Sequence, residues 1–115
     1  MPGLGTPETP SRVMTHALSS PVNSDIRAVS WPTNLVLADI SVGKEPDGVG
    51  VDWLTNRVYV SNYGSDTVTI IDGATNAVLK TIPVGDTPDG LTVDQLTGRV
   101  YISNSNSNSV SVIER

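Results

Sequence analysis

Apolar residues alternate with polar ones in short runs along residues 33–115, and turn-forming residues separate the runs. A period of two predicts β-strands that bury one face. Ten Gly and eight Pro residues interrupt any long helix, so the chain is predicted to be all-β. The expected strands form four types, each present twice: 35–40 and 77–82, 48–52 and 90–94, 57–61 and 99–103, and 67–71 and 109–113.

The strand pattern recurs because the sequence itself is repeated. Residues 33–72 and 75–114 match at a constant offset of about 42 residues, a period typical of propeller blades, solenoids or arrays. The shared residues are turn formers, such as Pro46-Asp47-Gly48, and strand residues, such as Arg57-Val58-Tyr59. Four short strands in each period predict one propeller blade per repeat.

The first 32 residues differ from the rest of the chain. They are rich in Pro, Ser and Thr and show no sustained periodicity, so we expect an extended or disordered arm, with helix possible only over 11–20. The arm has no continuous apolar segment, and we therefore recognise no signal peptide there. No later segment is long and apolar enough to predict membrane insertion.

Composition narrows the classes of partner and chemistry. The net charge is -5 and the cationic residues are scattered, which argues against nucleic acid as a partner. The chain has no Cys, so it has neither disulfides nor thiolate metal ligands. It contains one His, His16, in the N-terminal arm without neighbouring ligand residues. We expect no catalytic residues, no cofactor and no metal site.

The repeat resembles the YVTN-type β-propeller repeat. The resemblance covers Thr33 to Arg115 and depends on Arg-Val-Tyr-Val-Ser-Asn at 57–62, its counterpart at 99–104, and Ile-Asp-Gly-Ala-Thr-Asn at 71–76. Ser61 and Ser103 depart from the residue that names the family. The resemblance implies two four-stranded antiparallel blades, which form a partial propeller and are built from the two repeats 33–74 and 75–115. It also implies a secreted or cell-surface location, as is common in the family.

By the same resemblance, the strands at 48–52 and 90–94 are innermost and those at 35–40 and 77–82 are outermost. The strand at 109–113 then lacks an outer neighbour, and the strand at 35–40 lacks a blade before it. Two blades do not close a ring, since propellers use about four to eight. Two explanations remain open: a fragment of a larger propeller, or a homo-oligomer in which the 35–40 strand completes the last blade of the next chain.

Four residues are candidate partner contacts. Trp53 occupies a turn where the other repeat has Gln95, so it is either a contact or packed on an adjacent loop. Tyr63 lies in the 63–66 loop, which differs from its counterpart at 105–108. Asp52 and Asp94 end the inner strands, where they either place charge at a channel mouth or initiate turns.

Two functions from different classes fit these residues. We favour a non-enzymatic propeller module that presents its loops to a protein or glycan partner. The alternative is a fragment of a propeller enzyme, a lyase or hydrolase, whose active-site residues lie outside this chain.

Overall fold

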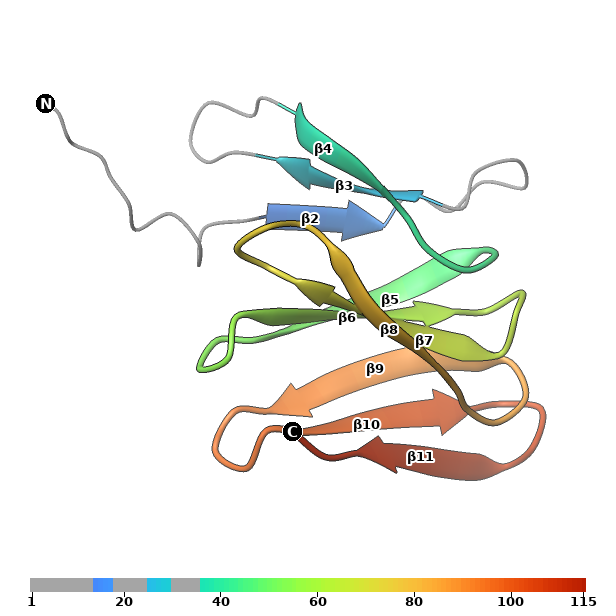
Figure 1. Ribbon diagram of the computed structural model, residues 1–115. Helices are drawn as coiled ribbons and strands as arrows, with labels where there is room; N and C mark the ends of the chain where they lie inside the picture. The colour runs from blue at the N-terminus through green and yellow to red at the C-terminus, as the bar shows by residue number, and fades with distance from the viewer. Residues whose placement is uncertain (1–13, 18–24, 30–35) are drawn as a thin grey trace, which may run out of the picture.

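The computed structural model describes residues 14–17, 25–29 and 36–115. These residues form strands, turns and irregular segments, and none of them is helical. The strands make three antiparallel sheets that lie one beside another, face to face (Figure 1). The strands are β2 Met14–Ala17, β3 Asp25–Val29, β4 Val36–Ser41, β5 Pro46–Asp52, β6 Arg57–Asn62, β7 Thr67–Asp72, β8 Val78–Pro83, β9 Pro88–Asp94, β10 Arg99–Asn104 and β11 Ser109–Ile113.

The middle sheet has the strand order β5-β6-β7-β8, and the C-terminal sheet has the order β9-β10-β11. All eight strands predicted from the repeat are present, with ends within about two residues of the expected ones. Equivalent strands pair in the same register: Tyr59 lies opposite Ile70, and Tyr101 lies opposite Val112. The two repeats therefore build the same meander, and the all-β, partial-propeller prediction is confirmed.

The N-terminal sheet differs from expectation. Residues 1–32 were expected to form an irregular arm, but β2 and β3 lie within this range and pair with β4 in the order β2-β3-β4. The strand predicted at 35–40 is β4, and it belongs to this sheet. The expectation that no blade precedes it is therefore wrong. Ile26 is fully buried opposite Ile40, so apolar packing holds this sheet in place despite the polar composition around it.

Three of the turns follow the chemistry that the sequence predicts. Asn56 and Gly98, at equivalent positions before β6 and β10, both have positive φ, at 54° and 78°. Asn76, at the end of the turn before β8, has a φ of 64°. Asn and Gly tolerate this left-handed region better than other residues, which explains their place at these turns.

A buried amide explains the Asn that ends both β6 and β10. The side chain of Asn62 donates hydrogen bonds to the hydroxyls of Thr67 and Thr69, at 3.0 and 2.9 Å. Asn104 does the same to Ser109 and Ser111, at 3.3 and 2.9 Å. These bonds join the second strand of each sheet to the third. Each Asn needs a nearby glycine, Gly43 or Gly85, where an added Cβ would lie 2.6 Å from the amide.

Two hydrophobic cores lie between the three sheets, and β6 contributes to both. Val58 and Val60 point into the first core, with Ile26 and Ile40 of the N-terminal sheet. Tyr59, between them in sequence, points into the second core, with Val100 and Ile102 of the C-terminal sheet. Strand alternation therefore gives the middle sheet two buried faces, and each face needs a neighbouring sheet.

Candidate functional site: an open sheet face and its polar ends

The interface between the middle and C-terminal sheets depends on a close approach of their inner strands. A Cβ added at Gly50 of β5 would lie 2.5 Å from Leu91 Cδ2 and 3.0 Å from Val93 Cγ2. Glycine at this position therefore leaves the space that two β9 side chains fill. Ordinary carbon contacts are near 3.5–4.0 Å. The sheets pack this closely because β5 lacks a side chain there.

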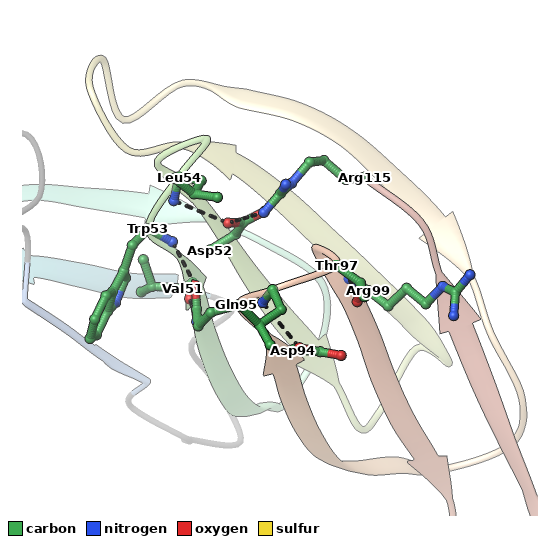
Figure 2. Close-up of polar contacts among 10 residues, drawn as sticks. Val51, Asp52, Trp53, Leu54, Asp94, Gln95, Thr97, Arg99 and Arg115 are labelled. Carbon is green, nitrogen blue, oxygen red and sulfur yellow. Dashed lines mark hydrogen bonds and ion pairs between the residues drawn. The ribbon is translucent and has the colours of Figure 1, made fainter.

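Polar contacts fix the same interface at one end, where β5 and β9 lead into their turns (Figure 2). The side-chain amide of Gln95 donates to the backbone carbonyl of Val51 at 2.7 Å and accepts from the backbone N–H of Trp53 at 3.0 Å. One side chain that follows β9 thus bonds two backbone groups of the middle sheet.

An ion pair lies beside this contact. Arg115 donates from Nε to Asp52 Oδ2 and from a terminal nitrogen to Asp52 Oδ1, both at 2.9 Å. This fork-to-carboxylate geometry is the strongest form of the Arg–Asp contact. Asp52 is fully buried, and the Arg115 hydrogen bonds hold its pKa below the ordinary value for aspartate, against the opposing effect of burial. Asp52 is therefore a charged group that locks the two sheets together.

Asp94 is the repeat equivalent of Asp52, but its surroundings differ. It accepts a hydrogen bond from the backbone N–H of Leu96 at 3.0 Å, and bonding to the Thr97 hydroxyl lowers its pKa. Within residues 36–115, no salt bridge to Asp94 is formed. The Arg99 guanidinium, which begins the next strand, pairs instead with Glu114 at 2.9 Å. Asp94 thus keeps its charge and remains half-exposed.

The face of the C-terminal sheet that points away from the middle sheet is open to solvent. Val110 and Val112 are 60% and 53% exposed, whereas their equivalents Val68 and Ile70 are 0% and 7% exposed. Tyr101 is half-exposed, although Tyr59 is buried. We call this surface the open face. A shallow pocket of about 210 Å³ lies on it, lined by Gly90, Leu91, Thr92, Tyr101, Ser103 and Val110.

The four candidate contacts occupy different environments. Trp53 is 73% exposed and Tyr63 is 44% exposed, each in a turn of the middle sheet. Asp94 is half-exposed at the turn after β9, where it does bond the turn backbone. Asp52 is buried in its ion pair with Arg115, so it does not place free charge at a channel mouth. Of the four residues, the structure leaves Trp53, Tyr63 and Asp94 accessible.

Sequence reasoning missed Gln95 and Arg115, the two side chains that tie the sheets together. Both differ between the repeats, since Gln95 corresponds to Trp53 and Arg115 to Gly73. Comparing the repeats drew attention to shared residues, which are architectural. The sequence did carry a signal for these contacts. At equivalent turn positions, one repeat has a polar residue where the other has an apolar residue or a glycine.

Neither a metal centre nor a membrane-spanning helix is found in the described ranges. Among residues 14–17, 25–29 and 36–115, His, Cys, Asp and Glu side chains nowhere gather in threes that could hold a metal ion. The same residues include no helix of the length and apolar character needed to span a bilayer.

Comparison with solved structures places the chain among β-propellers. Hydrazine synthase from Kuenenia stuttgartiensis matches 79% of this chain at 27% identity, with a TM-score of 0.75. The dihydro-heme d1 dehydrogenase NirN, in complex with DHE, matches 98% of it at 15% identity, with a TM-score of 0.76. Both are β-propeller proteins. The chain spans about a quarter of either one, 26% and 23% respectively.

Comparison of the sequence alone identifies no relative. No protein-family model matches the chain, and no curated protein matches it.

Proposed function

We propose that this protein is a non-enzymatic β-propeller module of the YVTN type, built to pack against a further blade of the same kind. That blade comes either from a second copy of this chain, in a head-to-tail homo-oligomer, or from additional polypeptide of a larger propeller. The completed ring then presents its turns to a protein or glycan partner. The three sheets are three blades of that ring.

One observation carries the proposal: the open face has the side chains of a buried interface. Tyr101, Val110 and Val112 occupy the positions where the middle sheet buries Tyr59, Val68 and Ile70. In the middle sheet, the cover for these positions is a sheet with the same strand order. Exposed apolar surface of this kind marks an interaction site. A sheet of the same repeat is the partner whose shape already fits it.

An aspartate at one end of the open face indicates which charge the covering blade carries. Asp52 shows that this inner-strand aspartate is buried beneath a guanidinium from the next sheet. Asp94 holds the same position on the open face and has no such partner among the described residues. We therefore expect the covering blade to bring a cation to Asp94, since an aspartate buried there without one would be costly.

Trp53 and Tyr63 remain the proposed contacts for a protein or glycan. Both are aromatic, both are exposed, and both lie in turns whose residues differ between the repeats. Exposed aromatic side chains of this kind are enriched at binding interfaces. A rigid scaffold with variable turns is a common arrangement for recognition.

A second candidate function is supported by the comparisons. The two matched structures are named as a synthase and a dehydrogenase. This chain would then be one part of a propeller enzyme whose catalytic residues lie in other blades. The carboxylates of Asp52 and Asp94 serve turns and a sheet contact. This favours the non-enzymatic role for this segment.

Measurement of mass in solution tests the proposal. We expect the chain to associate as its concentration rises, and Val110→Lys to reduce that association by placing a charge on the open face. Leu96→Lys is the matched control, because Leu96 is 92% exposed and its equivalent Leu54 stays 73% exposed although the middle sheet is covered. Association that Val110→Lys leaves unchanged would rule out the open face as the interface. A monomer at every concentration would reject the homo-oligomer and leave additional polypeptide as the source.

A further inference from the structure

Three large apolar side chains are exposed on two neighbouring turns at one end of the molecule. Trp53 and Leu54 lie in the turn after β5, and Leu96 lies in the turn after β9 (Figure 1). These residues are 73%, 73% and 92% exposed, the highest values among the large apolar residues whose exposure the structure describes. We call this surface the apolar tip. It is distinct from the open face, which lies on the strands of the C-terminal sheet.

Turn chemistry does not account for the two leucines. Leu54 and Leu96 are equivalent residues of the repeat, 42 positions apart. In each turn, the aspartate that ends the strand accepts the leucine N–H, at 3.2 Å between Leu54 and Asp52 and at 3.0 Å between Leu96 and Asp94. The leucine side chains take no part in these bonds. Leu54 stays exposed although both faces of its sheet are covered, so packing of a neighbouring blade does not explain it either.

Polar contacts hold the Trp53-Leu54 backbone in place (Figure 2). Gln95 accepts the backbone N–H of Trp53 at 3.0 Å, and Asp52 accepts that of Leu54. Arg115 in turn fixes Asp52 through two hydrogen bonds. Two consecutive amides of the turn are thus anchored across the sheet interface. A side chain on a fixed turn loses little conformational entropy on binding, and exposed tryptophan is enriched among the residues that dominate binding energy.

The shape of the apolar tip favours a helix as its partner. None of its three side chains lines the open-face pocket or a second pocket of about 300 Å³ between the middle and C-terminal sheets, so a small ligand has neither cavity to enter here. Turns offer no strand edge for pairing, so a bound segment must satisfy its own backbone hydrogen bonds, as a helix does. Packed sheets are about 10 Å apart, and seven helical residues rise about 10.5 Å, so one apolar stripe reaches both turns.

Charge and area indicate which helix fits. The net charge of -5 repels a second copy of the chain or an anionic bilayer and attracts a cationic partner. Asp72 is half-exposed and forms no salt bridge within residues 36–115. Its turn lies against that of Leu54, since the Gly73 N–H donates to the Asn56 carbonyl at 2.8 Å. The three apolar side chains expose on the order of 450 Å², less than the roughly 800 Å² per partner of a stable dimer, so the area suits a short segment.

We propose that the apolar tip binds a basic amphipathic helix of another protein, whose apolar face covers Trp53, Leu54 and Leu96 and whose cationic side chains lie toward Asp72. The proposal deepens the proposed function, on whose non-enzymatic binding role it rests, because it names the chemistry of the protein partner. It holds for any blade that covers the open face.

Titration calorimetry with model peptides tests the proposal. The probe is the Leu/Lys helix LKKLLKLLKKLLKL, and its counterpart has Glu in place of every Lys. We expect saturable binding of the Lys peptide to the full chain and no binding of the Glu peptide. Leu54→Ser and Leu96→Ser should each weaken binding about five- to thirtyfold, because each removes an apolar contact without changing the charge. Val110→Ser is the matched control on the open face and should leave the affinity unchanged.

Hydrogen exchange locates the bound peptide, which should protect the amides of 53–56 and 95–98. Equal affinity for both peptides would overturn the proposal, as would a loss caused by Val110→Ser and not by Leu54→Ser. Vesicles of phosphatidylcholine and phosphatidylserine test a lipid surface. Binding to vesicles that Leu54→Ser weakens, without binding of the peptide, would replace the helix by a bilayer. Failure here leaves association through the open face unaffected, because the mass measurement with Val110→Lys reads that face alone.

Discussion

Val68 and Val110 offer a matched pair of substitutions, because they are equivalent residues in the two repeats and differ in burial. Val68 is fully buried between the middle and C-terminal sheets, and Val110 is 60% exposed on the open face. Replacement by Ala removes the same two carbon atoms at both sites. The two variants therefore compare one interface that is covered with one that is open.

The expected magnitudes follow from burial. At Val68, the lost transfer free energy is about 0.8 kcal/mol for each carbon group, and the residual cavity adds to it, so Val68→Ala should cost about 2–3 kcal/mol of unfolding free energy. At Val110, the loss is mainly strand propensity and partial burial, about 0.5 kcal/mol. The difference of about 2 kcal/mol corresponds to roughly 1 M in the midpoint of urea unfolding, for a slope near 2 kcal/mol/M.

The assay is urea unfolding of both variants and the parent chain, followed by circular dichroism at several protein concentrations. In dilute protein, we expect the large loss for Val68→Ala alone. Equal losses at the lowest concentration would refute the reasoning, because Val110 would then be covered within a single chain. A loss for Val110→Ala that grows with concentration would identify a second copy of the chain as the cover, through the mass-action link between association and stability.

Three further substitutions test the contacts between and within the sheets. Gly50→Ala should destabilise by about 1 kcal/mol in thermal or urea unfolding, since overpacking against Leu91 outweighs the gain in backbone entropy, and Leu91→Ala should relieve the loss. Asp52→Asn should cost about 1–2 kcal/mol at neutral pH by breaking the bidentate contact with Arg115. Because the pKa of Asp52 is lower in the folded chain, its contribution is present above the unfolded value of 3.8 and is lost as pH falls through the lower folded pKa, so acid titration of stability should be shallower in Asp52→Asn. Asn62→Ala should cost about 1–3 kcal/mol, measured in the same way, because two bonds between strands are lost from a buried site.

The strands and turns of the two repeats could be predicted because two independent signals agree there. Alternation of apolar residues fixes the strands, and residues such as Asn56 and Gly98 fix the turns between them. Each signal occurs twice at one offset, which removes most of the ambiguity of short apolar runs. The pairing order β5-β6-β7-β8 was also expected, from the resemblance to the propeller repeat, and it is a simple meander joined by short turns.

The N-terminal sheet escaped prediction because its signal is present but weak. Ile26 and Ile40 pair as Val68 and Ile82 do, at the same offset of 42 (68 − 26 and 82 − 40). The Thr33-Asn34 sequence before β4 also matches Thr75-Asn76 before β8. However, β3 carries Arg27 where β7 has Thr69, and Pro and Ser residues surround it, so alternation alone does not identify the strand. Burial of Ile26 against the middle sheet stabilises this strand, although its local sequence has only a weak strand pattern.

The candidate site could be predicted only in part, for a related reason. For Trp53 the sequence left two alternatives, a partner contact or packing on an adjacent loop, and the structure leaves its side chain 73% exposed. Tyr63, a candidate because its loop differs between the repeats, is 44% exposed. Burial of Asp52 does not follow, because it depends on Arg115, which is distant in sequence and has no equivalent cation in the other repeat. A charged residue is predicted to be exposed unless the partner that would neutralise it in the interior is known.

The differences between the repeats also indicate that neighbouring blades are not interchangeable. Gly50 leaves room for Leu91, but the equivalent residue on the open face is Thr92, whose side chain takes that space. A covering blade with leucine at the Leu91 position would be overpacked, so we expect a smaller residue there. The same blade must bring a cation to Asp94, as Arg115 does for Asp52. Shared residues therefore build each blade, whereas unshared residues determine which blade follows it.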